Sequence, residues 1–448
     1  MRGQEQFASQ NGHIILNMLF RRFVLLALST CLAFVCSAWA QIADAPPDTV
    51  AGIPVNYTES LAGTYTLPNP LVLANGKTVK DAKTWTEKRR PEIVKLFEEN
   101  QFGRAPGRPA DMSFEVFDKG TPAFDGKATR KQVTIYLSKD RNGPKIDLLV
   151  YVPAGASKPS PLLLNVSFSA NSLAVDDPGV QEGEIWGPDH KKVPASKGRS
   201  FGKLPVAKFI DAGYGVTTFY YGDVDPDFLG GVPLGVRALY LKAGQTEPAP
   251  DEWGAISAWA WGASRAMDYL ETDPAVDAKR VAITGVSRLG KTVMWAGAHD
   301  TRFAMTIASC SGEGGAALSR RNYGETIAHL MAPTRYPYQF AGNWAKYAAH
   351  PDQSPVDANL LVALMVPRPV LLQTGNTDKW SDPKGEFLAA IAAGPVYKLF
   401  GKQGLDADEV PPAGQAILHD IGYEIHAGGH GMVPSDWDVY LQFMKLKL

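Results

Sequence analysis

The stretch ITGVSRLGKT, residues Ile283–Thr292, matches the motifs of two different folds. The spacing G-x-x-x-x-G-K-T over residues 285–292 matches a phosphate-binding loop. Alternatively, Ser287 is a nucleophile on a sharp turn between a strand and a helix. That second motif has a glycine two residues after the serine, where this chain has Leu289.

The surrounding sequence favours the serine turn. A phosphate-binding loop usually follows the first strand of its domain, whereas about four strand candidates precede residue 285. It also requires an acidic residue after a later apolar strand to help hold magnesium. The run FAMTIASCSG offers none, although Asp378 after RPVLLQTGNT occupies a comparable place. A serine that only caps the following helix is the remaining alternative for Ser287.

Strand and helix patterns alternate through most of the chain. Short apolar runs bounded by Gly, Pro, Asp or Asn predict strands at KQVTIYL, KIDLLVYVP, PLLLNVSF, YGVTTFYY, RVAITGV, FAMTIASC, RPVLLQTG and IGYEIHAG. Helical spacing predicts helices over 206–212, 253–270, 289–299, 383–392 and 435–446, and one over 84–101 that Pro91 interrupts. This alternation predicts a mostly parallel central sheet with helices on both faces, a three-layer α/β sandwich. The first two strands can pair antiparallel through a turn at residues 140–143.

Composition and charge narrow the class of protein. The 448 residues are 45% hydrophobic and 20% charged, with a net charge of −1, so no basic excess points to nucleic acid. Residues 41–70 are rich in Pro, Ala, Asp and Thr and are expected to be an extended surface segment. We expect residues 71–448 to form a single catalytic domain and the protein to be a monomer.

The N-terminus has the pattern of a secretory signal. Arg21 and Arg22 precede the apolar run FVLLALSTCLAFV, and Ala38 and Ala40 occupy the A-x-A cleavage positions. We expect residues 1–40 to be a signal peptide cleaved after Ala40, with Met18 a possible true start, and the protein to be secreted or periplasmic. No apolar run is long enough for a membrane span. Cleavage leaves Cys310 as the only cysteine, which excludes an internal disulfide.

A serine nucleophile needs a base, and a histidine after the last predicted strand supplies one. In the α/β-hydrolase order the nucleophile is followed by an acid and then by a histidine. His430 lies in a loop beyond Gly428 and Gly429 and is the predicted base. His426 belongs to the apolar strand itself and is the alternative, with a core role as its ordinary interpretation.

The acid of this triad is predicted to be Asp378. It directly follows the strand RPVLLQTG, where the α/β-hydrolase fold places its acid. Asp382 and Glu313 are the competitors.

Several longer motifs resemble one family. GVSRLGK, SGEGGAALSRRNYGET, RPVLLQTGNTDKWSDPKGEF and GGHG resemble the glucuronoyl esterases of carbohydrate esterase family 15, and in particular their bacterial members. The resemblance extends from about residue 102 to the C-terminus. Its most specific element, Gly-x-Ser-Arg-x-Gly-Lys, accounts for the displaced glycine. It implies an α/β-hydrolase fold.

The resemblance also implies roles for matched residues. Ser287 and His430 become nucleophile and base, and Arg288 donates to the oxyanion through its backbone N–H and its guanidinium. Lys291, Glu325 and Trp380 become contacts to the sugar. Each has an ordinary alternative: surface charges at a helix start for Arg288 and Lys291, a solvated carboxylate for Glu325, and a packing ring for Trp380.

One position departs from the family pattern. Many members carry their catalytic glutamate where this chain has Cys310, and a thiol cannot hold an imidazole as a carboxylate does. Some bacterial members use an aspartate at the position of Asp378 instead.

The implied activity is hydrolysis of esters of (4-O-methyl-)glucuronic acid, in particular those between xylan and lignin, through an acyl-enzyme. No metal or cofactor is expected, since no Cys/His cluster has metal-binding spacing. Two rivals remain. One is another carbohydrate or aryl esterase on the same fold, such as an acetyl xylan or feruloyl esterase, and the other is a carbohydrate-binding protein with a degenerate site.

Overall fold

The computed structural model describes residues 48–448, which all belong to one compact unit. The predicted signal peptide, its cleavage site and residues 41–47 lie outside the described residues. No helix within residues 48–448 combines the length and apolar character needed to cross a membrane.

The centre of the fold is a ten-stranded sheet in the order β13-β14-β12-β11-β10-β6-β9-β5-β4-β3. The six strands from β14 to β9 run parallel, whereas β13 at one edge and β5, β4 and β3 at the other pair antiparallel. The bounds are β3 Ser113–Ala123, β4 Ala128–Tyr136, β5 Lys145–Pro153, β6 Ser160–Ser167, β9 Gly215–Tyr220, β10 Val276–Val286, β11 Met305–Ser309, β12 Val370–Gly375, β13 Gln415–Leu418 and β14 Ile421–His426.

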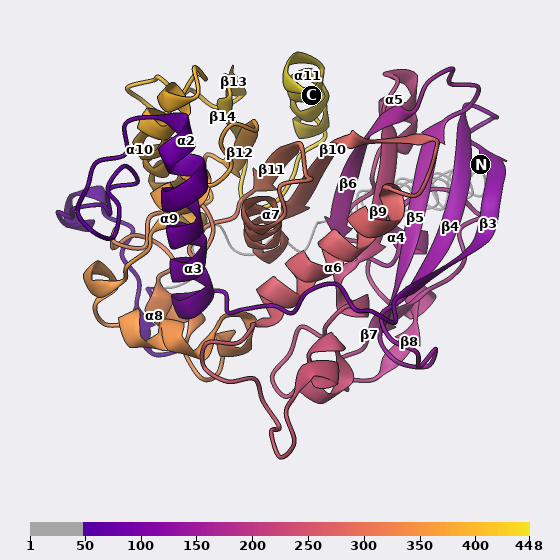
Figure 1. Cartoon of the computed structure of the whole chain (residues 1–448), viewed down its shortest axis with the longest axis horizontal. Helices are drawn as coiled ribbons and strands as arrows, with labels where there is room; N and C mark the ends of the chain where they lie inside the picture. The colour runs from indigo at the N-terminus through magenta and orange to yellow at the C-terminus, as the bar shows by residue number, and fades with distance from the viewer. Residues whose placement is uncertain (1–47) are drawn as a thin grey trace, which may run out of the picture. The chain divides into compact units, whose positions relative to one another are not determined.

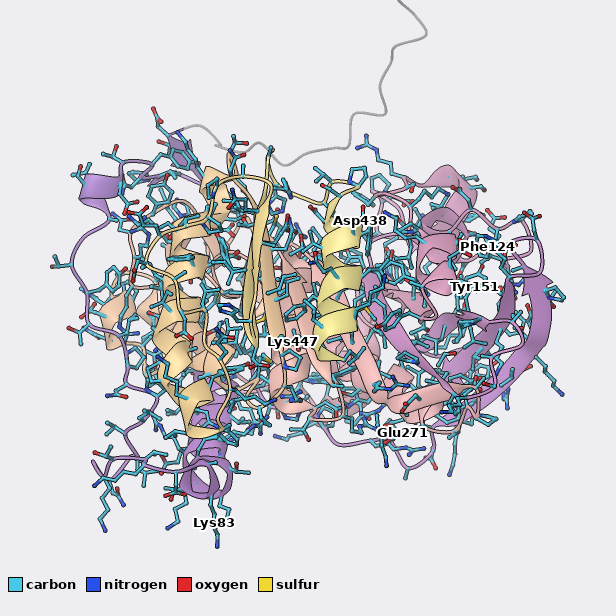
Figure 2. The ribbon with its side chains drawn as sticks, turned by 90° about the horizontal axis from the view of Figure 1, so that it is seen from above. Lys83, Phe124, Tyr151, Glu271, Asp438 and Lys447 are labelled. Carbon is cyan, nitrogen blue, oxygen red and sulfur yellow. The ribbon has the colours of Figure 1, made fainter. Side chains whose placement is uncertain are left out.

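Helices cover both faces of this sheet (Figure 1). Side chains alternate between faces along a strand, so Leu162 and Leu164 of β6 enter one apolar core and Leu163 enters the other. The first core includes residues of α3 (Arg90–Asn100), α6 (Ala255–Leu270), α7 (Arg288–His299), α9 (Ala358–Ala363) and α10 (Pro383–Leu399). The second includes residues of α5 (Val206–Asp211) and α11 (Asp436–Lys447), the helix marked by Asp438 and Lys447 in Figure 2. The predicted three-layer arrangement is confirmed.

The predicted hairpin is also confirmed. Strands β4 and β5 pair antiparallel, and the N–H of Gly143 donates to the carbonyl of Asp140 in the turn. The edge strand β3 was not predicted, because SFEVFDKGTPA contains Gly120 and Pro122, and its pairing with β4 has two irregularities. Proline and glycine are tolerated at such an edge, where one side of the strand needs no partner.

Two prolines stand in helical regions, Pro91 in the first turn of α3 and Pro395 inside α10. The interruption expected at Pro91 is a π-helical turn, Trp85–Arg89, that joins α2 (Ala82–Thr84) to α3, and the N–H of Arg90 donates to the carbonyl of Trp85. The helix predicted to end at residue 392 continues as α10 through Pro395 to Leu399. Burial of α10 against the sheet offsets the hydrogen bond that Pro395 removes.

The remaining elements are short. Residues 48–70 contain the two-residue strands β1 (Thr49–Val50) and β2 (Ile53–Pro54), and Glu59 pairs with Arg321 and Lys384 of the main body. The hydrogen bond from Arg321 lowers the pKa of Glu59 to about 2. The other short elements are α4 (Asn171–Ala174), β7 (Glu184–Trp186), β8 (Lys192–Pro194) and α8 (Ile327–Leu330).

Candidate active site

Ser287 lies on a strained turn between β10 and α7. Its φ is 59° and its ψ is −126°, a conformation that a residue with a side chain rarely adopts. A Cβ added at Gly285 would lie 2.6 Å from the carbonyl oxygen of Leu289, and one added at Gly290 would lie 2.6 Å from that of Ser309. Gly290 therefore lets the first turn of α7 approach the end of β11, and its placement there explains the shifted motif. The side chain of Ser287 makes no helix-capping hydrogen bond.

His430 and Asp378 meet at the carboxyl ends of two neighbouring parallel strands. Asp378 follows β12 and His430 follows β14. The Nδ1–H of His430 donates to Oδ2 of Asp378 at 2.8 Å, and the side chain of Asp378 is fully buried. The hydroxyl of Ser381 also lies 3.1 Å from Nδ1 of His430.

The end of β11 connects this pair to the serine turn. The N–H of Ser287 donates to the carbonyl of Ser309 at 2.8 Å. The next residue, Cys310, accepts through Sγ from the N–H of Gly431 at 3.4 Å. The thiol sulfur, a carboxylate oxygen of Asp378 and a ring nitrogen of His430 all lie within 4.8 Å of one another. The serine turn and the His430 loop are therefore held by adjacent residues.

Asp382 and Glu313, the competing acids, have other partners. Asp382 caps α10 through the N–H of Gly385 and accepts from Nε of Arg321 at 2.8 Å. Burial raises the pKa of Asp382 to about 6, although Arg321 opposes the shift. Glu313 accepts from the hydroxyl of Ser319 at 2.6 Å, and burial raises its pKa well above the usual value.

His426 lies in the core, as its position in the strand indicated. Its Nδ1 lies 3.2 Å from Oδ2 of Asp436, and its Nε2–H donates to the carbonyl of Gly429 at 3.0 Å. Burial alone would lower the pKa of His426, but the hydrogen bond and charge of Asp436 raise it. His426 therefore braces the loop that carries His430.

Arg288, the first residue of α7, has its guanidinium beside a carboxylate that the sequence did not point to. Its Nη1 donates to Oδ2 of Asp227 at 2.5 Å, and its Cζ lies 4.7 Å from the centre of the Tyr336 ring. Burial alone would lower the pKa of Arg288, but Asp227 and the surrounding tyrosines together raise it. The side chain keeps 19% of its surface exposed.

The three predicted sugar contacts are linked by ion pairs and by a contact between Arg335 and the Trp380 ring. The ammonium of Lys291 donates to the carbonyl of Ser311 at 2.7 Å and lies 3.9 Å from Oε2 of Glu325. Burial lowers the pKa of Lys291 and the charge of Glu325 opposes the change. Nη2 of Arg335 forms a salt bridge with Oε1 of Glu325 at 3.1 Å, and the guanidinium lies 5.2 Å from the ring of Trp380, which is only 5% exposed.

Sequence reasoning missed three residues of this region. They are Asp227, Ser381 and Glu386, whose Oε1 accepts from the hydroxyl of Ser311 and the N–H of Gly312. Burial raises the pKa of Glu386 to about 8. Ser381 follows the predicted Trp380 directly, so that proximity was a usable signal. Asp227 stands in DVDPDF, where three equally spaced aspartates gave no reason to choose it.

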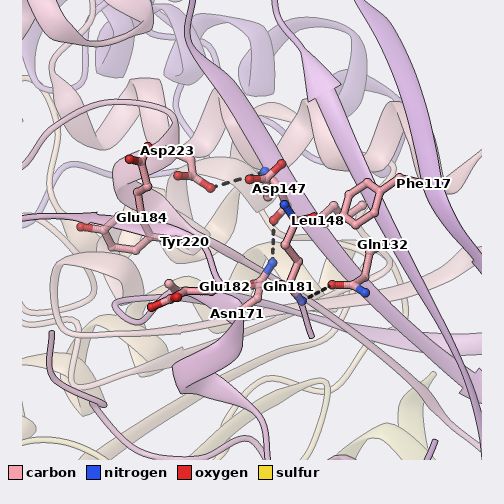
Figure 3. A pocket seen from close by; sticks show the side chains of 12 residues that line it. Phe117, Gln132, Asp147, Leu148, Asn171, Gln181, Glu182, Glu184, Tyr220 and Asp223 are labelled. Carbon is pink, nitrogen blue, oxygen red and sulfur yellow. Dashed lines mark hydrogen bonds between the residues drawn. The ribbon is translucent and has the colours of Figure 1, made fainter. Parts of the chain in front are cut away.

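A separate small pocket lies beside β4 and β5 (Figure 3). The N–H of Asp147 donates to Asp223 there at 3.4 Å, and burial, followed by the charge of Asp147, raises the pKa of Asp223 to about 8. None of the candidate catalytic or sugar-contact side chains lines this pocket.

Known proteins resemble this chain along nearly all of its length. The family model described as glucuronyl esterase, fungi, matches residues 248–401. The solved glucuronoyl esterase from Solibacter usitatus is 48% identical, with a TM-score of 0.83, over 86% of this chain and 99% of that one. Carbohydrate esterase MZ0003, from an unknown prokaryotic organism, is 42% identical over 92% of this chain and 97% of its own length. The 4-O-methyl-glucuronoyl methylesterase of Podospora anserina is 26% identical over 70% of this chain and 56% of its own length.

Proposed function

Because this chain belongs to the glucuronoyl esterases of carbohydrate esterase family 15, a family of carboxylic ester hydrolases with the α/β-hydrolase fold, we propose that it hydrolyses esters of (4-O-methyl-)glucuronic acid. The ester joins C6 of the sugar to an alcohol. The products are a glucuronate and the free alcohol.

One observation supports this proposal most. The helix that begins after the strained Ser287 carries Arg288 and Lys291 on its first turn, and the Lys291 ammonium lies 3.9 Å from Glu325. A guanidinium next to the nucleophile suits a developing oxyanion. A paired lysine and glutamate offer a donor and an acceptor for the hydroxyls of a sugar acid.

The first step is acylation of Ser287. The Nδ1–H of His430 donates a hydrogen bond to Oδ2 of Asp378 at 2.8 Å, so that Nε2 is the basic nitrogen of the neutral ring. That nitrogen takes the proton of Ser287 as the hydroxyl oxygen attacks C6. Asp378 stabilises the imidazolium that forms. Arg288 and the backbone N–H groups at the start of α7 stabilise the negative oxygen.

Acylation is complete when the imidazolium of His430 gives its proton to the leaving alcohol and the bond between C6 and the alcohol oxygen breaks. The second step regenerates the enzyme. A water molecule, deprotonated by His430, then attacks the acyl-enzyme, and Ser287 leaves with the proton that His430 returns. The sugar product leaves as glucuronic acid, which loses its proton to water and becomes glucuronate. The protons exchanged between Ser287, the alcohol and the attacking water all pass through His430.

Lys291, Glu325 and Trp380 are proposed to bind the sugar. Lys291 is buried and already donates to a carbonyl, so its ammonium has a fixed position. We expect Lys291→Ala to raise KM for a glucuronate ester at least 10-fold and to change KM for p-nitrophenyl acetate, which has no sugar, much less.

The proposal is tested by comparing two substrates. We expect the protein to hydrolyse benzyl glucuronate with a higher kcat/KM than p-nitrophenyl acetate, and a fluorophosphonate to label Ser287 covalently. Ser287→Ala is the control for both measurements. If Ser287 is labelled but benzyl glucuronate is not hydrolysed, the protein is a serine esterase of another specificity. If Ser287 is not labelled and neither substrate is hydrolysed, the protein only binds its ligand.

A second candidate is an acetyl xylan or feruloyl esterase on the same fold. The observation that favours it is Cys310, which stands where many members carry a glutamate and whose sulfur contacts the loop after His430. Measuring acetylated xylan and methyl ferulate beside benzyl glucuronate decides between the candidates.

We further propose that the substrate is the ester between a glucuronate branch of xylan and a lignin alcohol, and that a monomeric protein acts on it outside the cytoplasm. Cleavage after Ala40 would give a mature N-terminus at Gln41. N-terminal sequencing of protein from the periplasm and from the culture medium tests that cleavage, and light scattering tests the monomer.

A further inference from the structure

We propose that Asp227 is a positioning residue of the reaction, which orients the guanidinium of Arg288 toward the oxyanion. This inference rests on the proposed function, because it assigns a role through Arg288. It concerns a carboxylate that comes from a different part of the chain, 61 residues before Arg288.

The carboxylate of Asp227 is fully occupied by donors from three segments. Oδ2 accepts from Nη1 of Arg288 at 2.5 Å and from the hydroxyl of Tyr221 at 2.8 Å. Oδ1 accepts from the hydroxyl of Tyr338 at 2.8 Å and from Nε2 of Gln339 at 2.7 Å. A carboxylate has about four acceptor positions, so none is left for another partner. Four bonds from separate directions fix its orientation.

The surrounding segments are themselves anchored. Tyr221 begins the 3-10 turn that follows β9, and Gln339 ends another 3-10 turn whose Tyr338 carbonyl accepts from Arg237 at 3.3 Å. The Asp227 carboxylate thus lies on a rigid frame. Arg288, on the first turn of α7, is held to this frame from outside its own helix.

Asp227 therefore binds one nitrogen of the Arg288 guanidinium, and the other N–H groups can donate to the oxyanion. Among residues 48–448, Asp227 is the one acceptor that bonds this guanidinium, and it uses only Nη1. The ring of Tyr336 covers one face at 4.7 Å. The other N–H groups of Arg288 lie in the plane of the guanidinium group. A donor held in place before the reaction avoids the reorganisation that a mobile arginine would require.

The neutral donors also explain how a carboxylate can stand beside an oxyanion site. Asp227 would otherwise cancel much of the positive charge of Arg288. Tyr221, Tyr338 and Gln339 donate to the same carboxylate and disperse its charge over three further hydrogen bonds. Hydrogen bonds to a carboxylate are strong because the acceptor is charged. The pair can therefore orient Arg288 and leave part of its charge for the reaction.

The chain contains a matched pair for comparison. Asp177 accepts from Nη1 of Arg130 at 2.9 Å and from the hydroxyl of Tyr151 at 2.8 Å, and both side chains of that ion pair are buried. Tyr151 is marked in Figure 2, and Arg130 lies on β4, which β6, β9 and β5 separate from β10. Asp177→Asn removes the same kind of contact without touching Arg288.

The test is a double-mutant cycle on kcat. Asp227→Asn, Arg288→Ala and the double variant are compared with the wild type on p-nitrophenyl acetate and on benzyl glucuronate. We expect Arg288→Ala to lower kcat about 100-fold to 1,000-fold and Asp227→Asn about 10-fold to 100-fold, with KM changed less than 3-fold. The double variant should be no slower than Arg288→Ala within about 3-fold, because Asp227 acts only through Arg288.

Several outcomes would overturn the inference. If the fold losses in kcat of the two single variants multiply in the double variant, Asp227 does not act through Arg288. If Asp177→Asn lowers kcat as much as Asp227→Asn does, the loss reflects a general effect on folding. An unchanged kcat in both Asp227→Asn and Tyr338→Phe would remove the role altogether. If Asp227→Asn does not fold, Tyr338→Phe replaces it in the double-mutant cycle with Arg288→Ala, because it removes one of the neutral donors to Asp227. The acetate substrate keeps this test separate from the proposed sugar specificity, since wild-type turnover of acetate alone would contradict only the latter.

Discussion

The hydrogen bond from His430 Nδ1 to Asp378 Oδ2, 2.8 Å long, joins the loops that follow two adjacent parallel strands. The fold brings together residues 52 positions apart because the carboxyl ends of β12 and β14 lie at the same edge of the sheet. Neither Glu313 nor Asp382 has such a contact with His430 among the described residues. The acid at the end of β12 therefore has the geometry to orient the imidazole.

This contact predicts unequal effects for the two acids. Asp378→Asn should lower kcat about 10⁴-fold, because an amide cannot fix the same tautomer of His430 or stabilise its imidazolium. Glu313→Gln should retain most of the activity, because its partner is the hydroxyl of Ser319. Initial rates on benzyl glucuronate and on p-nitrophenyl acetate measure both. An inactive Glu313→Gln beside an active Asp378→Asn would reverse the assignment.

Cys310 offers a second prediction about the same triad. Its sulfur lies within 4.8 Å of both the Asp378 carboxylate and the His430 ring, so a carboxylate placed there would approach the imidazole. We expect Cys310→Glu to restore activity at least 10-fold when added to Asp378→Ala. Cys310→Gln in the same background is the matched control and should restore none. Equal rates for the two double variants would contradict the prediction.

The elements that carry the proposed triad were predictable from the sequence, because buried parallel strands are short apolar runs with clear ends. RVAITGV, RPVLLQTG and IGYEIHAG gave β10, β12 and β14, and so placed residues 287, 378 and 430 at one edge of the sheet. The contact between Asp378 and His430 followed from that placement.

The residues that position the charges were not predictable in the same way. Asp227 reaches Arg288 through irregular backbone after β9, where no periodicity constrains the direction of a side chain. Similarly, α10 continues through Pro395 because the residues before and after this proline are buried, and their packing outweighs the low helix propensity of proline. The sequence pattern does not reveal this packing. Tertiary contacts decided both cases.

The strained backbone of Ser287 predicts that glycine at this position gives a more stable protein than alanine. At φ 59° and ψ −126° a side chain causes strain of about 1 to 3 kcal/mol, whereas glycine adopts such angles freely. Ser287→Gly should therefore unfold about 1 to 4 °C above Ser287→Ala in thermal denaturation. Both variants should be inactive, so activity does not confound the comparison. A lower Tm for Ser287→Gly would mean that the turn stores no strain.

The buried carboxyl of Glu424 predicts how stability depends on pH. Burial, and next the charge of Asp436, raise the pKa of Glu424 to about 8, although His426 opposes the shift. Between the ordinary pKa of about 4.3 and 8, the folded state holds a proton that the unfolded state has released. The contribution of Glu424 to the free energy of unfolding therefore falls as pH rises through this window, by at most about 1.4 kcal/mol per pH unit. Glu424→Gln, which stays neutral, should remove that decline.

Urea denaturation at pH 5, 6, 7 and 8 measures this effect. The variant and the wild type should have similar midpoints at pH 5, where the Glu424 carboxyl is protonated in the folded state. The variant should be the more stable protein at pH 8. Glu87→Gln, at an exposed carboxylate of the same type, is the control and should leave the pH dependence unchanged. A parallel decline in wild type and Glu424→Gln would show that Glu424 is ionised in the folded protein and does not cause the pH dependence.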